Sequence, residues 1–328
     1  MRHLLEGSTG IVTGSDSRSN RTLSASLLRC GFRGEGIADS SVWVVKSHFP
    51  ERMGYLRFRT KRVILLVRNP FDSIESYFHM GLTNTHDKML TKDVMQSEPL
   101  QDLWRDFVLN EASVWAAFHL FWLQQSVQIP VLFVRFEDLL LNENATMAEI
   151  LQFMQNASPQ TSVASSCVAF SSAASAPENR VNGLGGPGYA QKSSTRKIGK
   201  SLAALSTLQQ REVTATTGYF MDLFGYQYVP EGGNEAISRL NVLPLEMGKI
   251  SLAMAPLPGL PAGLGQSRDG GAAVRSYDLT WKLDAGPLSG TGGLIINNPV
   301  SIRAADDKFG RGMTDIRKGL TSAGVLPG

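Results

Sequence analysis

An arginine and a serine stand eight residues apart in the stretch RVILLVRNPFDSIESYFHM, which occupies positions 62–80. Arg68 directly follows an apolar run, and Ser76 lies about two helical turns further on if a helix follows. A guanidinium offers a planar fork of donors that suits a phosphate, and the start of a helix adds unpaired N–H groups. The spacing therefore predicts an anion site. An Arg68–Asp72 salt bridge, with Ser76 facing a neighbouring helix, is the alternative left open here.

Lys46 and His48 form a second pair of candidate groups, at the end of the short apolar segment 42–46. Residues two apart in an extended chain point their side chains to the same side. In this arrangement a lysine can stabilise charge on a transferring group while a neutral histidine removes a proton from an acceptor hydroxyl. A neighbouring ammonium helps to keep the histidine neutral. The competing interpretation is a backbone-bonded histidine beside a surface lysine.

Continuously apolar segments alternate with helical patterns, and together they would position these side chains. Strands covered on both faces are expected at 42–46, 62–67 and 130–136. Helices are expected at 1–6, 24–30, 70–80, 99–127, 144–155 and 205–224, with a loop at 7–20 and the aromatic residues of 99–127 in the core. The alternation predicts an α/β fold of three layers, with a mainly parallel sheet between helices. Ligands bind beyond the carboxyl ends of such strands, where the candidate side chains stand.

Composition narrows the class of protein. The chain has 328 residues and is 42% hydrophobic, which supports a sizeable core. Its net charge of +3, from 32 basic and 29 acidic residues, is too small to indicate a nucleic-acid-binding protein. No apolar run approaches the roughly 20 residues that span a bilayer, and the start lacks a signal-peptide pattern. We expect a soluble chain without a membrane segment, in the cytoplasm, or in the Golgi lumen if an N-terminal anchor is missing from it.

Two further features concern organisation. Cys30 and Cys167 have no metal-binding spacing and are interpreted as buried free thiols, although a single bridge between them stays open. Composition changes near residue 228, because the rest is rich in Gly, Pro and Ala. We therefore predict a domain at 1–228 and a partly irregular extension at 229–328, with one strand at 275–283 and a short helix at 315–320.

The two candidate segments together resemble the sulfotransferases that use PAPS (3′-phosphoadenosine 5′-phosphosulfate). KSHFP at 46–50 is similar to the KTHLP segment of that family, and RNPFDSIESYFHM at 68–80 is similar to its 3′-phosphate-binding segment. RKIGK at 196–200 resembles the late basic loop that closes over the donor. CGFRGEG at 30–36 and TGS at 13–15 resemble the sulfotransferase-like domain of WSC-domain proteins. The resemblance covers about residues 1–228.

This resemblance implies a P-loop-type α/β fold and transfer of a sulfonate group from PAPS to a hydroxyl or amine of a small molecule or carbohydrate. It assigns the donor contacts to Arg68, Ser76, Arg196, Lys197 and Gly199. His48 would be the general base, and Lys46 would stabilise the transfer. No metal is implied, because cationic side chains and backbone donors meet the charges of PAPS.

One element of the family has no counterpart in this sequence. Sulfotransferases cradle the 5′-phosphosulfate in a glycine-containing loop after the first strand, whereas TGIVTGSDS at 9–17 lacks the lysine of a P-loop and follows an expected helix. We therefore expect an N-terminally truncated fold, without its first strand and phosphate loop, and impaired transfer. An inactive sulfotransferase-like binding module and a different P-loop nucleotide-binding protein are the alternatives. The acceptor and the oligomeric state are not predicted.

Overall fold

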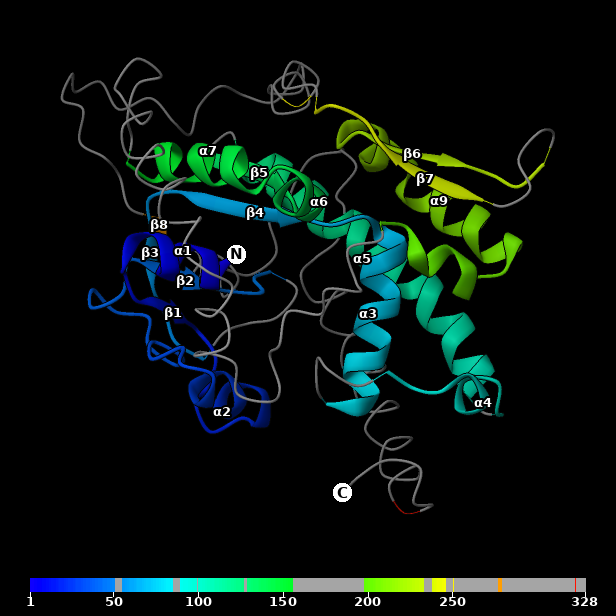
Figure 1. The fold of residues 1–328 in the computed structure, drawn as a ribbon, viewed down its shortest axis with the longest axis horizontal. Helices are drawn as coiled ribbons and strands as arrows, with labels where there is room; N and C mark the ends of the chain where they lie inside the picture. Colours follow the sequence, from blue (N-terminus) through cyan, green and yellow to red (C-terminus); the bar gives the residue numbers. More distant parts are fainter. Residues whose placement is uncertain are drawn as a thin grey trace, which may run out of the picture.

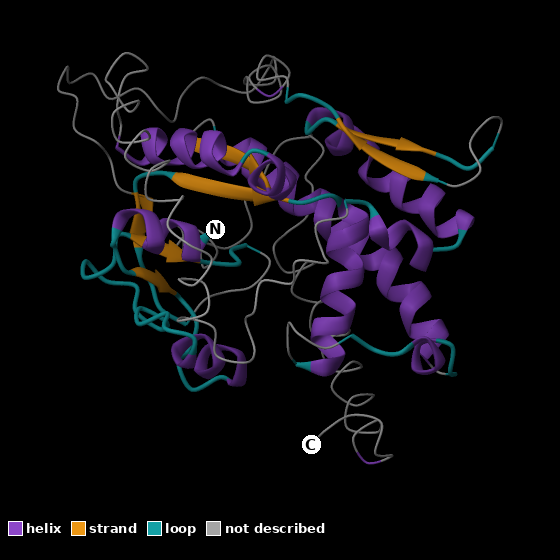
Figure 2. Cartoon of the chain, viewed as in Figure 1, coloured by secondary structure: helices purple, strands orange, loops and turns teal. Residues whose placement is uncertain are grey.

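The computed structural model describes residues 1–250, except 51–54, 85–88, 99, 127–128, 156–197, 233–237 and 246–249, and also describes 277–278 and 322. The helices are α1 (Arg2–Thr9), α2 (Thr22–Arg29), α3 (Pro70–Thr83), α4 (Lys92–Met95), α5 (Leu100–Gln125), α6 (Phe136–Leu141), α7 (Glu143–Gln155), the 3-10 helix η3 (Lys200–Ala204) and α9 (Thr207–Leu223). The strands are β1 (Thr13–Ser15), β2 (Val44–Lys46), β3 (Arg59–Thr60), β4 (Val63–Val67), β5 (Val131–Arg135), β6 (Tyr226–Val229), β7 (Arg239–Val242) and β8 (Tyr277–Asp278). Short runs of strands and of helices follow one another along the chain, as Figures 1 and 2 show.

The strands pair two by two. β1 pairs with β2 and β4 pairs with β5, both in parallel, whereas β6–β7 and β3–β8 are antiparallel. The α/β class is thus present. Strands β2, β4 and β5 lie in the three predicted strand regions and pair in parallel, but each parallel ladder has two strands. Parallel pairing brings the carboxyl ends of paired strands to the same edge. Lys46 therefore ends β2 beside Ser15 of β1. Val67 ends β4 beside Arg135 of β5, and Arg68 follows directly.

The interpretation of residues 7–20 as loop is wrong in part, because β1 lies within it. Thr13, Gly14 and Ser15 are all buried, and a side chain in place of Gly14 would meet the carbonyl oxygen of Ile37 at 2.1 Å. β1 is held to α1 by Arg2, whose guanidinium donates to Thr13 and pairs with the buried Glu35 at 2.6 Å. A strand of three residues with a central glycine is too short to show apolar periodicity, so its partners define it.

Local signals explain where α3 begins and ends. The Asn69 side chain accepts a hydrogen bond from the Asp72 N–H at 2.9 Å, and Pro70 occupies the first turn, where its missing N–H costs nothing. The helix ends where Asn84 adopts a left-handed conformation with φ 52°. The helix runs about one turn beyond its predicted end at residue 80.

A first hydrophobic cluster joins the two parallel ladders. Leu5 of α1, Leu132 of β5 and Ile150 of α7 are buried together, and Val44 of β2 and Ile64 of β4 both pack against this cluster. α1 and α7 thus cover side chains from both ladders. In Figure 1 both helices lie along this part of the molecule.

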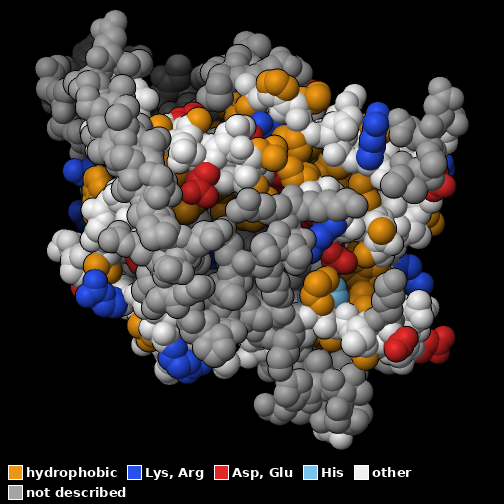
Figure 3. All heavy atoms as spheres, in the orientation of Figure 1, with side chains coloured by type: hydrophobic (Ala, Val, Ile, Leu, Met, Phe, Trp, Pro, Cys, Tyr) orange, Lys and Arg blue, Asp and Glu red, His pale blue; other side chains and the backbone are white. Residues whose placement is uncertain are grey.

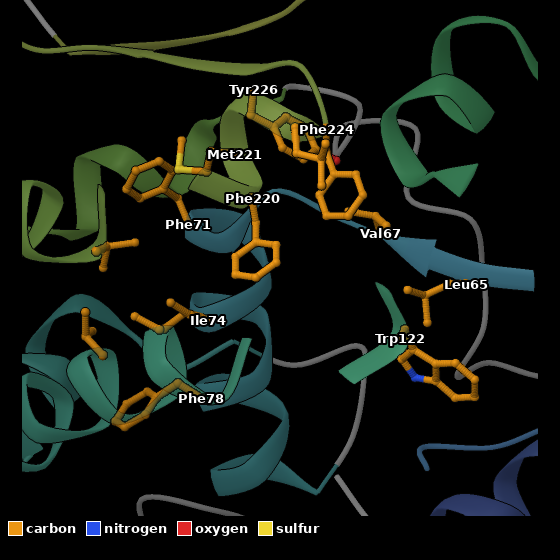
Figure 4. Packing of buried hydrophobic residues seen from close by; sticks show 14 of the residues in the cluster. Leu65, Val67, Phe71, Ile74, Phe78, Trp122, Phe220, Met221, Phe224 and Tyr226 are labelled. Carbon is orange, nitrogen blue, oxygen red and sulfur yellow. The ribbon is translucent and has the colours of Figure 1, made fainter. Parts of the chain in front are cut away.

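The larger cluster lies between β4–β5 and helices α3, α5 and α9. Its buried members include Val67, Phe71, Ile74, Phe78, Trp104, Phe107, Trp122, Phe220, Met221 and Phe224. Figure 4 shows Phe71 beside Met221 and Phe224 near Val67. The prediction that the aromatic residues of α5 belong to the core is confirmed for Trp104, Phe107 and Trp122.

The β6–β7 hairpin continues the packed unit past the predicted boundary at residue 228. Leu240 and Val242 of β7 pack against the larger cluster, and Ile250 is buried within it. Arg135, itself buried, donates from Nη1 to the carbonyl oxygens of Phe224 at 3.0 Å and Leu243 at 2.6 Å. The unit therefore reaches at least residue 250, while the division of the remaining chain stays a prediction. β8 falls within the predicted strand at 275–283, and the helix expected at 315–320 lies outside the described residues.

The cysteines, the longest apolar helices and the surface charges were also features of the sequence predictions. Cys30 is buried and free, and Cys167 lies outside the described residues. Among the described residues no helix is long and apolar enough to cross a membrane. On the face drawn in Figure 3, the described Lys and Arg side chains are scattered and do not form one patch.

His119 predicts a pH-dependent stability. Its ring is surrounded by Trp115, Phe220 and Phe224, and its Nδ1 donates to the Trp115 carbonyl oxygen at 2.7 Å. Burial lowers the pKa of His119 from 6.5 to about 4. Between pH 6.5 and 4, His119 is therefore protonated in the unfolded chain but neutral in the folded one. The contribution of neutral His119 to the free energy of unfolding is complete above pH 6.5 and is lost as the pH falls.

We expect the free energy of unfolding to drop by about 2 kcal/mol more in the wild type than in His119→Phe between pH 7 and 4.5. Phenylalanine keeps the aromatic packing and removes the titration. Urea unfolding of both proteins at the two pH values measures the difference. Equal losses of stability in the two proteins would assign the acid sensitivity to other groups.

Candidate active site

Arg68 follows β4 and presents an unsatisfied donor. Its guanidinium lies over the ring of Phe136, at 5.0 Å from the ring centroid, and its buried Nε has no hydrogen-bond partner. The backbone is fixed, because the Arg68 carbonyl oxygen accepts from the indole N–H of Trp115 at 3.1 Å. A buried donor without a partner is rare in folded proteins and calls for an explanation such as a ligand. Arg68 has the features of an anion-binding side chain held ready by stacking.

The start of α3, by contrast, is already occupied by protein groups. Asn69 is fully buried, and its side-chain amide donates to Asp72 at 2.9 Å and to Glu137 at 2.7 Å. The Asn69 backbone N–H also donates to Glu137, at 3.1 Å, and Tyr226 donates its hydroxyl to the same carboxylate at 2.6 Å. Burial and the charge of Glu137 raise the pKa of Tyr226 well above its usual value. The idea that first-turn N–H groups of α3 bind the phosphate is therefore not supported.

The alternative of an Arg68–Asp72 salt bridge is not what the structure shows. Both oxygens of Asp72 accept hydrogen bonds from the segment before and within η3. Gly199 N–H donates to Oδ2 at 2.9 Å, and Ser201 N–H donates to Oδ1 at 3.1 Å. The Ser201 hydroxyl donates to Glu75 at 2.5 Å. The late glycine segment is thus docked on α3.

Gly199 has a conformational reason to be glycine. Its φ is 72°, in the left-handed region, and a Cβ at this position would approach the Leu240 Cβ to 3.0 Å. Gly199 therefore lies between α3 and β7. The structure brings this candidate residue to the helix that carries Ser76, although the two were far apart in sequence.

Ser76 lies on the exposed side of α3, next to Glu75. Burial acts to raise the pKa of Glu75, but hydrogen bonds from His79 and Ser201 and the charges of His79 and Lys200 outweigh it and lower the pKa. Lys200, which was not among the predicted contacts, thus adds positive charge close to this part of α3. The exposure of Ser76 leaves its hydroxyl accessible, and its contact with a phosphate stays a prediction.

Lys46 and His48 lie at the carboxyl end of β2, Lys46 half-buried and His48 exposed. Both engage in interactions with other residues. Between them, the Ser47 hydroxyl donates to Asp16 at 2.6 Å and accepts from the Phe49 N–H at 3.0 Å. This arrangement fixes the turn that carries His48.

Asp16 is a residue of this site that sequence reasoning missed. It is buried at the end of β1, and its backbone carbonyl also accepts from the N–H groups of Tyr55 and Leu56, at 2.7 and 3.2 Å. Burial raises the pKa of Asp16, against the opposing effects of the Ser47 hydrogen bond and the Lys46 charge. In the sequence, the one indication of this role is that Asp16 directly follows Thr13–Ser15, the residues that form β1.

Phe49 links the two halves of the candidate site. Its buried ring belongs to the same cluster as Val67 and Phe71 and makes edge contacts with Phe121 at 5.7 Å and Trp122 at 6.3 Å. The segment that carries Lys46 and His48 is therefore anchored in the core that also supports Arg68. Arg196 and Lys197 lie outside the described residues. No group of metal-ligating side chains occurs among the residues that are described.

A cavity elsewhere does not coincide with this site. A cavity of about 340 Å³ lies beside β5, α6 and α7 and is lined by residues that include Arg135, Asp138 and Glu149, but by none of the predicted site residues. Burial and the charge of Asp138 raise the pKa of Glu149. Since Arg135 is already paired with Asp138, at 2.7 Å, this cavity offers no spare cation for a phosphate.

The residues of this candidate site lie in a part of the sequence that is similar to known proteins. The family model of the sulfotransferase domain matches residues 35–183, a range that contains Lys46, His48, Arg68 and Ser76. A WSCD family member from Aedes aegypti is 32% identical over 160 residues, which is 47% of this chain and 45% of that protein. WSCD family members from Drosophila melanogaster and Drosophila pseudoobscura pseudoobscura are each 30% identical over 162 residues, 47% of this chain and 46% of each relative. No solved structure matches the chain significantly.

The chain spans somewhat less than half of the length of these relatives. The matched range begins after β1 and ends before Gly199, so the family match covers the two central motifs and not the late glycine segment. Residues 35–183 therefore match the sulfotransferase domain family, as the resemblance carried by KSHFP and RNPFDSIESYFHM predicts.

Proposed function

We propose that the chain binds PAPS and transfers its sulfonate group to a hydroxyl or amine of a small-molecule or carbohydrate acceptor. The observation that carries the proposal is the buried, unpartnered Nε of Arg68 within a matched sulfotransferase domain. Charge-assisted hydrogen bonds to a phosphate would satisfy this donor. Ser76, Gly199 and the basic pair Arg196 and Lys197 would complete the contacts with the 3′-phosphate.

In the proposed reaction, His48 takes the proton from the acceptor hydroxyl as its oxygen forms a bond to sulfur. The bond between sulfur and the bridging oxygen of the donor breaks, and the departing phosphate keeps the electron pair. Lys46 stabilises the negative charge that develops there. Ser47 and Asp16 hold the turn that presents His48. The proposed reaction needs no metal, because cationic side chains would meet the charges of the donor.

The finer fold proposal is a P-loop-like, three-layer arrangement in which both parallel ladders belong to one sheet. Val44 of β2 and Ile64 of β4 support it, because they pack against one shared cluster. Among the described residues no strand leads into a glycine-rich phosphate cradle, and the one sequence candidate is partly strand β1. Each such donor is worth about 10²–10³ in rate in other enzymes. We therefore propose weak donor binding and slow transfer by the 328-residue chain.

The proposal is tested by comparing two nucleotides that differ in the 3′-phosphate. We expect calorimetry to give at least about tenfold tighter binding of 3′,5′-ADP than of 5′-AMP, because one phosphate adds at least one charge-assisted contact. Labelled PAPS and a panel of hydroxyl and amine acceptors then report transfer. Equal affinity for the two nucleotides would remove the assignment of this site to PAPS.

A further inference from the structure

Asp72 is the point at which the late glycine segment meets α3. It accepts from Gly199 N–H at 2.9 Å, Ser201 N–H at 3.1 Å and the side-chain amide of Asn69 at 2.9 Å. The carboxylate is buried, with 3% of Asp72 exposed. Three donors converge on one buried carboxylate, so the segment is attached to α3 through this side chain.

Only a carboxylate satisfies this arrangement. Both of its oxygens accept: Oδ1 from the Ser201 N–H, and Oδ2 from the Gly199 N–H and the Asn69 amide. An asparagine has one accepting oxygen, and its NH₂ group would face an N–H donor. The geometry therefore depends on the charge and symmetry of the aspartate, not on its size.

The same side chain is linked to Arg68 through Asn69. Asn69 directly follows Arg68, donates to Asp72, and donates twice more to Glu137 of α6. Glu137 and Tyr226 close this network toward β6. Asp72 thus joins the end of β4, where Arg68 lies, to the segment that contains Gly199.

We infer that Asp72 is a positioning residue for the donor site: it fixes the Gly199–Ser201 segment relative to Arg68, so that both contact the 3′-phosphate. This inference rests on the proposed function. Without Asp72 the segment loses its backbone attachments on α3 and retains the hydroxyl contact of Ser201 with Glu75. Contacts that depend on sub-ångström placement are sensitive to the loss of such support.

The test compares Asp72→Asn with a control that weakens the opposite side of the same segment. Gln210, also buried, donates to the carbonyl oxygens of Leu202 at 2.8 Å and Leu205 at 3.0 Å, on the side of α9. Gln210→Met removes these bonds and leaves Asp72 intact. Calorimetry with 3′,5′-ADP and 5′-AMP is carried out on the wild type, both variants and Arg68→Ala, after circular dichroism has confirmed that each is folded.

We expect Asp72→Asn to reduce the preference for 3′,5′-ADP over 5′-AMP about tenfold, and Gln210→Met to leave it within about twofold. If Asp72→Asn does not fold, Asp72→Glu takes its place, with an expected loss of about threefold because the longer side chain keeps the charge but displaces both accepting oxygens. A full preference in a folded Asp72→Asn or Asp72→Glu protein, together with its loss in Arg68→Ala, overturns the positioning role alone. Absence of any preference in the wild type overturns the proposed function as well.

Discussion

Replacing Arg68 with alanine is expected to weaken the affinity for 3′,5′-ADP by about 10- to 150-fold. The estimate corresponds to the roughly 1.5–3 kcal/mol of a hydrogen bond to a charged group. The buried Nε of Arg68 is one of three buried side-chain nitrogens without a partner among the described residues, and it alone belongs to a cation; stacking on Phe136 keeps the guanidinium in place before any ligand arrives. Calorimetry at constant ionic strength measures the change.

Two matched variants control this experiment. Arg68→Lys keeps the charge but not the planar fork, so its affinity should fall between those of the wild type and Arg68→Ala. Arg105, an exposed arginine on α5 that pairs with Asp102 at 3.1 Å, should tolerate alanine without any change in affinity. An Arg68→Ala protein that binds 3′,5′-ADP as tightly as the wild type would show that the guanidinium serves packing alone.

Replacing His48 with alanine is expected to lower the rate of sulfonate transfer by about 10²–10⁴, the usual contribution of a general base. The affinity for 3′,5′-ADP should stay within about twofold, because His48 acts on the acceptor and not on the 3′-phosphate. Single-turnover transfer from labelled PAPS, at saturating donor, separates the two effects.

His3 provides the matched control for His48. It is also exposed, and its ring makes an edge contact with that of Phe32, at 6.5 Å between the ring centroids. His3→Ala should transfer at the wild-type rate. A His48→Ala protein with unchanged turnover would remove the base from the mechanism and favour a binding module that keeps the fold without the chemistry.

The sequence predicts those parts of the fold and of the candidate site whose signals lie close together along the chain. Arg68 and Asn69 could be placed because an apolar run, a cap and a proline follow one another, and these signals act locally. The core role of Trp104 and Trp122 followed from helical spacing. Asp16 and β1 could not be predicted, since three strand residues with a glycine carry no periodic signal and their burial depends on α1 and β2.

Long-range polar contacts account for the other misses. The roles of Asp72 and Glu137 depend on partners such as Gly199 and Tyr226, which are more than 80 residues away in sequence. The pairing of β7 with β6 is a further case, because the Gly- and Pro-rich composition beyond residue 228 gives no sign of it. Tertiary pairing decides such positions, and propensity alone does not.

The Arg135 bonds to Phe224 and Leu243 have a practical bearing on how this protein is produced. A gene fragment cut where the composition changes would delete the acceptor at Leu243, strip β6 of its hydrogen-bonding neighbour and uncover aromatic surface, which favours aggregation during expression. An expression boundary chosen beyond Ile250 keeps the guanidinium saturated and the hairpin whole. The contacts that Arg135 and β6 make with β7 and Leu243, and not the amino-acid composition beyond residue 228, should set the C-terminal boundary of an expressed fragment.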